Sequence, residues 1–174
     1  MTLIGPPVST PRVVHDVAVA DLVSRYRAVP PGTRVRLGKR TSNLFRFGAG
    51  QGRDETRSLD VDALTGVIDV DAAAGTAQVQ GMATYETLVA ATLAHGTMPL
   101  VVPQLKTITL GGAVTGLGIE STSFRHGLPH ESVLEMDVLT PSARSSRPPR
   151  TASTPISSAG SRIPTAPSGT PCAS

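Results

Sequence analysis

The chain has 174 residues, 39% of them hydrophobic and only 3% aromatic, which is enough for one ordinary globular domain. Its net charge of +3 comes from the C-terminal end, because residues 1–141 hold all 13 acidic residues and 12 of the 16 basic ones, whereas residues 142–174 hold four arginines and no acid. The globular part therefore gives no electrostatic reason to expect a nucleic-acid partner, and the single cysteine, Cys172, excludes an internal disulfide or a cysteine-based metal cluster.

Nothing in the sequence predicts secretion or a membrane span. The N-terminus has no basic segment followed by an apolar run, and no stretch of about 18 apolar residues occurs anywhere. A lone cysteine is typical of a reducing compartment, so the prediction is a soluble, cytoplasmic protein.

The first predicted element is a helix within residues 12–28, which follows a flexible N-terminus at residues 1–11. Val19, Leu22 and Tyr26 recur at helical spacing, and the helix is expected to start near Asp16. The Pro-Pro-Gly sequence at 30–32 ends it, and alternation at 33–37 predicts a short strand.

Several short strands and a second helix follow. Thr84 is the expected N-cap of a helix that runs to Ala94, buries Leu88, Val89 and Leu93, and is closed by Gly96. Extended segments are predicted at 59–64, 67–71, 75–80 (joined to the previous one by a hairpin turn at 72–75), 98–102, the glycine-rich stretch near 110 and 133–139. This mixed order predicts an α+β architecture.

The glycine-rich segment at 107–122 is the most informative motif. Four of its glycines lie within eight positions, and Thr107, Thr109 and Thr115 supply hydroxyl groups beside them. Glycines that adopt positive φ let backbone N–H groups approach an anion, so the segment predicts a cradle for a phosphate-bearing cofactor. The alternative is a tight turn in which small residues pack against a sheet.

A second anion site is predicted at residues 38–45, where a predicted strand ends in a loop. The sequence Gly-Lys-Arg-Thr-Ser-Asn-Leu-Phe combines a glycine, two cations and three short polar side chains. Such a loop can bind phosphate through its backbone and its hydroxyl groups.

Taken together, these motifs resemble the PCMH-type FAD-binding domain of the vanillyl-alcohol-oxidase superfamily. The resemblance covers residues 12–142 and is carried by four segments: Arg-Leu-Gly-Lys-Arg-Thr-Ser-Asn-Leu-Phe-Arg at 36–46, Gln-Val-Gln-Gly at 78–81, His-Gly-Thr-Met-Pro-Leu-Val-Val-Pro at 95–103 and Ile-Thr-Leu-Gly-Gly-Ala-Val-Thr-Gly at 108–116. The first loop, together with Gly-Ile-Glu-Ser-Thr-Ser-Phe-Arg-His-Gly at 118–127, looks most like the bacterial relatives of Δ24-sterol reductase.

The resemblance implies non-covalent FAD held between two small α/β subdomains, with its pyrophosphate on the two loops. The first loop would be formed by Gly38, Lys39, Arg40, Thr41, Ser42 and Asn43, and the second by Thr107, Thr109, Gly111, Gly112, Ala113, Gly116 and Gly118. Many relatives have a glycine-rich first loop, whereas Lys39 and Arg40 stand here and would pair with either the diphosphate or an acidic neighbour.

Other polar residues have a structural interpretation beside the functional one. His95 precedes a helix-ending glycine and suits a capping role better than a role at the flavin. His126 and His130 flank an exposed-looking loop, and Glu120, Ser121 and Arg125 would lie near the flavin ring or in a solvated loop. Spaced aspartates at 60, 62, 69 and 71 lack converging ligands, so no metal site is expected, and no catalytic residue is assigned.

The last 33 residues are expected to be a disordered tail, because they hold nine serines and six prolines and no Leu, Val, Phe or Tyr. A second hypothesis is that residues 143–174 are translated out of frame. One permissible codon choice for Ala-Arg-Ser-Ser at 143–146, read one base out of frame, gives Gly-Glu-Val-Val, the continuation usual in the family. The chain would then be the N-terminal part of a longer enzyme.

The function that the resemblance implies is that of an FAD-linked oxidoreductase acting by flavin-mediated hydride transfer on a small molecule, with reduction of a sterol-like C=C bond as the leading reaction. Oxidation of an alcohol, polyol or hydroxy acid is the second enzymatic hypothesis. Two non-enzymatic hypotheses stand beside them: a truncated, inactive FAD-binding fragment, and an adapter that acts through its basic tail.

Overall fold

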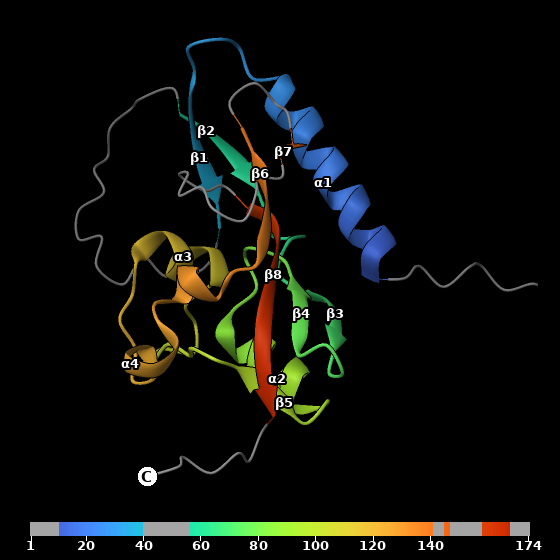
Figure 1. The fold of residues 1–174 in the computed structure, drawn as a ribbon. Helices are drawn as coiled ribbons and strands as arrows, with labels where there is room; N and C mark the ends of the chain where they lie inside the picture. Colours follow the sequence, from blue (N-terminus) through green and yellow to red (C-terminus); the bar gives the residue numbers. More distant parts are fainter. Residues whose placement is uncertain (1–10, 40–55, 141–144, 147–157, 168–174) are drawn as a thin grey trace, which may run out of the picture.

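The computed structural model describes residues 11–39, 56–140, 145–146 and 158–167. These residues form helices and strands in mixed order, built around two sheets, which confirms the predicted α+β class. Figure 1 shows the long helix α1 beside the smaller sheet, and the remaining helices gathered around the larger one.

Helix α1 (Pro11–Arg27) confirms the first predicted helix but begins five residues before Asp16. Proline suits the first turn of a helix because its missing N–H has no intrahelical partner there. An ion pair between Arg12 Nε and Asp16 Oδ1, 3.4 Å apart, spans the same turn. The helix therefore starts at the proline.

The smaller sheet consists of two parallel strands, β1 (Arg34–Gly38) and β2 (Thr56–Asp60), with Arg34 opposite Thr56 and Gly38 opposite Asp60. Strand β1 confirms the prediction for 33–37, whereas β2 ends where the strand at 59–64 was expected to begin. Helix α1 contacts β2 and buries Leu22 with Leu59.

The larger sheet has six strands in the order β3-β4-β8-β6-β7, with β5 also paired to β8. All of its pairings are antiparallel. The hairpin between β3 and β4 confirms the predicted turn, in which Gly75 adopts φ +61° and Ala74 N–H donates to Asp71 Oδ1 at 2.8 Å. The strands are β3 (Val67–Asp71), β4 (Thr76–Val79), β5 (Thr97–Pro99), β6 (Glu135–Leu139), β7 (Ser145–Ser146) and β8 (Ser158–Pro167).

Strand β8 differs from the expectation of a disordered tail at residues 143–174. It pairs with β4 on one side and β6 on the other, and Figure 1 shows it running through the middle of the molecule. The expectation rested on side-chain composition, whereas a strand between two others is held by backbone hydrogen bonds that most residue types can make. Composition alone therefore missed this strand.

Helix α2 (Tyr85–Leu93) has the predicted N-cap, because Thr84 Oγ1 accepts a hydrogen bond from Thr87 N–H at 3.2 Å. Gly96 (φ +69°) closes the helix region as predicted, and its N–H donates to Leu93 O at 2.9 Å. The predicted buried face was wrong at Leu93, which is 48% exposed. Leu88 is buried as predicted, and with Tyr85 and Thr92 it forms a buried face at i, i+3, i+7 spacing.

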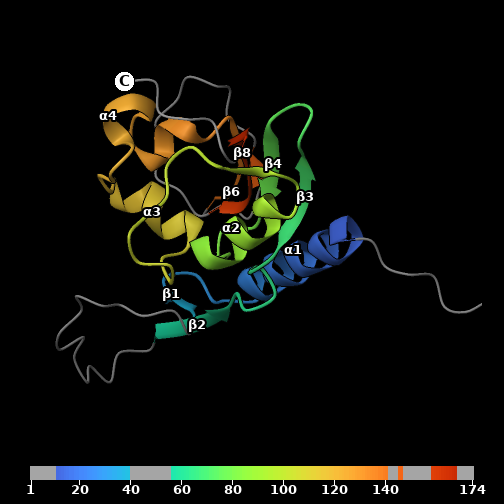
Figure 2. The ribbon, with the colours of Figure 1, turned by 90° about the horizontal axis from the view of Figure 1, so that it is seen from below.

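The glycine-rich stretch forms helix α3 (Leu110–Gly116), so the prediction of an extended segment was wrong. Thr109 caps the helix, its Oγ1 accepting a hydrogen bond from Gly112 N–H at 3.2 Å. Two more short helices follow, α4 (Ser123–His126) and the 3-10 helix η1 (Pro129–Ser132). In Figure 2, α3 and α4 lie on the side of the larger sheet away from α1.

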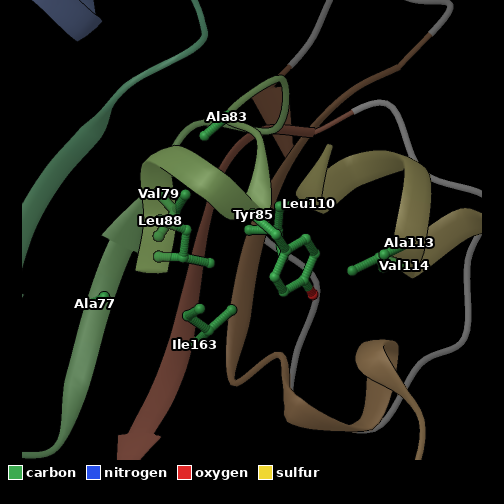
Figure 3. Close-up of a cluster of buried hydrophobic side chains, with 9 residues drawn as sticks. All are labelled: Ala77, Val79, Ala83, Tyr85, Leu88, Leu110, Ala113, Val114 and Ile163. Atoms are coloured by element: carbon green, nitrogen blue, oxygen red, sulfur yellow. The ribbon is translucent and has the colours of Figure 1, made fainter. Parts of the chain in front are cut away.

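Two clusters of buried side chains form the core. The α2–α3 cluster lies between the larger sheet and the two helices for which it is named (Figure 3). The α1 cluster lies between α1, β2 and the segment after β2. The α2–α3 cluster consists of Ala77, Val79, Ala83, Tyr85, Leu88, Leu110, Ala113, Val114 and Ile163. The α1 cluster consists of Leu22, Leu59, Val61 and Leu64.

Candidate functional site

The N-terminal ends of α2 and α3 are joined by backbone hydrogen bonds. Thr84 and Thr109, the two N-caps, form an antiparallel bridge. On either side of it, Tyr85 N–H donates to Ile108 O at 2.9 Å and Leu110 N–H donates to Ala83 O at 2.8 Å. Two segments that the sequence places about 25 residues apart are thus fixed to each other at the start of the glycine-rich helix.

The amides at the start of α3 all have protein partners. Leu110 N–H is bound to Ala83 O, Gly111 N–H donates to Gly81 O at 2.7 Å, and Gly112 N–H donates to the Thr109 hydroxyl oxygen. The expectation that the N–H groups of Gly111 and Gly112 face a phosphate is therefore corrected, because each already makes an internal hydrogen bond. Whether these residues line the cofactor site in another way stays a prediction.

The glycines of this segment do not adopt positive φ, which corrects the second part of the cradle argument. Among the residues that the structure describes, positive φ occurs at Gly32, Gly75, Gly96, Gly127 and the non-glycine Leu117. Leu117 takes the left-handed conformation (φ 51°) as the C-cap of α3, between Gly116 and Gly118. Small size matters at Gly112, where a Cβ would lie 3.0 Å from Thr109 Oγ1, whereas a Cβ at Gly116 would meet nothing within 4 Å.

The three threonines of the segment have different surroundings. Thr109 is buried and serves as the cap, while Thr115 Oγ1 donates to Gly111 O at 2.8 Å within the helix. Thr107 is exposed on the connection that leads into α3. Thr107 and Thr115 are thus both exposed, but the Thr115 hydroxyl is hydrogen-bonded within its own helix.

Only the beginning of the first predicted loop can be described. Gly38 ends β1 opposite Asp60, and Lys39, which follows it, is half-buried, whereas Arg40, Thr41, Ser42 and Asn43 lie outside the described residues. A Cβ at Gly38 would lie 2.5 Å from Ser58 Oγ and 3.1 Å from Leu59 O, so close packing against β2 requires glycine there. In both views the carboxyl end of β1 lies on the side of the molecule where α3 begins (Figures 1 and 2).

Charged groups near the helix starts are paired with one another. Lys106 Nζ lies 2.6 Å from Glu86 Oε1 in the first turn of α2, and Glu120 Oε2 accepts a hydrogen bond from Gln104 N–H at 3.2 Å. The pKa of the Tyr85 hydroxyl is raised by burial and, secondarily, by the negative charge of Glu120. Tyr85 therefore stays a neutral hydroxyl at physiological pH.

The histidines differ in burial. His95 and His126 are exposed, and His95 stands directly before the helix-closing Gly96 as expected. His130 was expected in an exposed loop, but its Nδ1 is buried without a hydrogen-bond partner in η1, a segment that contacts α3. Sequence reasoning missed His15, a buried histidine on α1, although its i+4 and i+7 spacing to Val19 and Leu22 places it on the buried face of that helix.

Within the described ranges, no group of three or more His, Cys, Asp or Glu residues is arranged to hold a metal ion. None of the helices described has both the length and the apolar composition required to cross a bilayer.

The comparisons with known proteins identify the class of domain. A family model described as an FAD binding domain matches residues 21–145, so the chain belongs to this family. The fold is that of a partial PCMH-type FAD-binding domain, and its cofactor is FAD. The family match includes both predicted phosphate loops.

One solved structure is similar to this chain in its fold. The chain resembles an alkyldihydroxyacetonephosphate synthase with a TM-score of 0.64 and 16% sequence identity, over 91% of this chain and 30% of that one. At this identity the likeness concerns the fold, and the chain spans less than a third of the length of that protein. A search of curated proteins by sequence found no match.

The described residues fit FAD in part. The exposed Thr107, the half-buried Lys39 and the open space beside Gly116 leave polar or unhindered surface next to the two predicted loops. The backbone N–H groups in the first turn of α3 do not provide such surface, because they are hydrogen-bonded within the protein. We therefore expect the residues that hold the diphosphate to lie in the first loop and in the segment that leads into α3.

Proposed function

We propose that this chain supplies the FAD-binding part of an oxidoreductase that transfers hydride between flavin and a small-molecule substrate. The observation that carries the proposal is the family match over residues 21–145. When bound, the flavin would supply the redox chemistry, and the protein would hold and orient it. Attachment is proposed to be non-covalent, and the compartment cytoplasmic.

In the proposed site, Lys39 and the loop that follows it neutralise the diphosphate, with Arg40, Thr41, Ser42 and Asn43 contributing further donors. Cationic and hydroxyl side chains are strong partners for phosphate oxygens. The described part of the second segment acts mainly as a rigid wall: Thr109 and Gly111 are held to residues 81–84 by a backbone bridge and a hydrogen bond, and Gly112 N–H is bound to the Thr109 hydroxyl oxygen. In this proposal Gly116 and Gly118 lie on the accessible side of the wall, and Ala113 supports it from the α2–α3 cluster, in which it is buried.

The proposed substrate is a sterol-like alkene whose C=C bond is reduced. The support is the resemblance of residues 118–127 to bacterial relatives of Δ24-sterol reductase. Flavin-dependent oxidation of an alcohol, polyol or hydroxy acid is the second candidate reaction. The structural neighbour is named for a different reaction, the synthesis of alkyldihydroxyacetonephosphate, and at 16% identity it favours neither.

Flavin retention tests the cofactor assignment directly. The protein purified with excess FAD is expected to retain the visible absorption band of flavin after desalting, and acid precipitation is expected to release the flavin into the supernatant. A colourless protein that remains folded by circular dichroism would contradict the proposal and favour an inactive fragment. Flavin that stays with the precipitate would contradict non-covalent attachment.

Gly112→Asp tests the second segment. A Cβ at this position would lie 3.0 Å from Thr109 Oγ1, so the variant changes both packing and charge. Gly112→Ala introduces the same Cβ without the charge, and Ala90→Asp adds a carboxylate to an exposed position of α2. Loss of flavin in Gly112→Asp, but not in the two controls, is expected. Equal retention in all three would remove this segment from the site.

We also propose that residues 143–174 arise from translation out of frame within a gene for a longer oxidoreductase. The chain covers only 30% of the similar structure. Strand β8 contains Pro164 and Pro167, each of which pairs with one neighbouring strand and lacks the N–H that a strand residue donates, and this composition is unusual for a strand. In addition, the Thr165 hydroxyl is buried without a partner.

The nucleotide sequence from the codon of Pro141 onward tests this proposal independently of FAD. An open continuation of the flavoprotein in the neighbouring frame is the expected result, and its absence would contradict the frameshift. An adapter function predicts instead that binding to acidic partners is salt-sensitive and disappears when residues 143–174 are deleted.

A further inference from the structure

A buried histidine connects α1 to the larger sheet. His15 and Gln80 are each 5% exposed, and His15 Nδ1 lies 3.1 Å from Gln80 Nε2. The other end of the same amide is also bound, because Gln80 Oε1 accepts a hydrogen bond from Gly66 N–H at 2.7 Å. The backbone N–H of Gln80 donates to Gly66 O at 3.0 Å, which holds the two residues in register.

These contacts determine the protonation state of the imidazole. A backbone N–H can only donate, so the amide atom of Gln80 that faces Gly66 must be the oxygen. The amide nitrogen then faces His15 and must donate, which leaves Nδ1 of His15 as the acceptor. The imidazole is therefore neutral, with its proton on Nε2.

A proton on Nδ1 would place two donors against each other in a buried site. Gln80 cannot reverse its amide in response without breaking the short hydrogen bond from Gly66. An unsatisfied buried donor is destabilising, and separating α1 from the sheet relieves the conflict. We propose that His15 is a proton-controlled latch that holds α1 on the larger sheet when the imidazole is neutral and releases it when the imidazole is protonated.

The charged neighbours of His15 modulate this behaviour. On α1, Asp16 favours the charged imidazole and Arg12 opposes it, and Asp137 on β6 favours it. Strand β3, which also contacts α1, carries the exposed Asp69 and Asp71, and β2 carries the exposed Arg57 and Asp60. Burial is the largest effect, and it lowers the pKa of His15 below its ordinary value of 6.5.

The latch lies next to the start of α3. Gln80 precedes Gly81, whose carbonyl oxygen accepts the hydrogen bond from Gly111 N–H. Release of α1 would therefore remove the His15 contact from the side chain of Gln80, the residue directly before the one that anchors the glycine-rich helix. The latch itself requires no cofactor.

The sign of the pH dependence follows from the lowered pKa. The unfolded chain binds a proton on His15 below about pH 6.5, whereas the folded chain does so only at lower pH. The contribution of the His15–Gln80 contact to the free energy of unfolding is thus complete above about pH 6.5 and is lost as the pH falls below it. His15→Asn keeps an acceptor oxygen near the position of Nδ1 but cannot be protonated. In this variant, the number of protons taken up on unfolding is expected to be lower than in the wild-type protein by up to about one, over the range from about pH 5 to 7.5.

Two variants and one spectroscopic measurement test the latch. His95→Asn, a change at an exposed histidine, is the control and is expected to keep the wild-type pH dependence. Gln80→Glu places a carboxylate beside His15 and is expected to raise the pKa of the imidazole. The nitrogen-15 chemical shifts of His15 in the wild-type protein are expected to show the proton on Nε2. A proton on Nδ1 at neutral pH would overturn the proposal.

Hydrogen exchange locates the effect. After correction for intrinsic rates, residues 11–27 are expected to lose protection on acidification before residues 76–79 do, and this difference is expected to disappear in His15→Asn. Simultaneous loss in both segments, or unchanged behaviour of the variant, would overturn the proposal.

Discussion

The two core clusters stabilise their parts of the chain by different means. The α2–α3 cluster joins nine buried residues from two helices, two strands and the segment between β4 and α2, and Val79 and Leu88 within it are fully buried. The α1 cluster has four buried residues, and the helix that covers it leaves Val13, Val14 and Val17 more than half exposed. The attachment of α1 therefore depends more on polar contacts, among them the buried bond between His15 and Gln80. A helix held by few apolar contacts is the element expected to detach first.

The largest effect is expected for Leu88→Ala. Leu88 has 0% exposure in the α2–α3 cluster, so truncation leaves a cavity that rigid neighbours cannot fill, and the free energy of unfolding should fall by about 3–4 kcal/mol. Urea denaturation measures the change. Leu93→Ala removes the same atoms from a side chain that is 48% exposed on the same helix, and a loss similar to that of Leu88→Ala would refute the assignment of the buried face.

A smaller effect is expected for Leu22→Ala. Leu22 is 8% exposed and lies in the α1 cluster, where fewer buried neighbours surround the lost atoms, so a destabilisation of about 2 kcal/mol is expected. Hydrogen exchange should show that protection falls mainly in residues 11–27. If Leu22→Ala proves more destabilising than Leu88→Ala, the ranking of the two clusters is wrong.

The smallest effect is expected for Thr109→Ala. The variant removes the acceptor for Gly112 N–H at the start of α3 and should destabilise the protein by about 1 kcal/mol. Thr109→Ser retains a hydroxyl at the cap and is expected to recover most of this loss in thermal unfolding. No difference between the alanine and serine variants would show that the cap bond contributes little.

Much of the fold could be predicted from local patterns. Prolines and glycine at 30–32 ended the first helix as expected, Thr84 and Gly96 bounded α2, and the extended segments predicted on either side of the hairpin turn located β3 and β4. These signals act within a few residues, since a cap, a turn or an alternating strand is decided by its immediate neighbours.

The glycine-rich segment shows where local prediction failed. Its glycines are compatible with a loop, a helix or a cradle, and the sequence does not choose among them. The choice is made by Gly81, Ala83 and Thr84, whose hydrogen bonds and bridge to residues 109–111 turn the segment into a capped helix.

The sequence by itself determined the class of the fold, the position of its turns and caps, and the resemblance that points to FAD, because these depend on short patterns of residues. Only the tertiary structure decided that residues 158–167 fill the middle of a sheet, that the amides of Gly111 and Gly112 are already bound, and that His15 must be neutral. Each of these facts depends on hydrogen bonds between distant segments. The donors and acceptors are visible in the sequence, but which of them meet is set by packing.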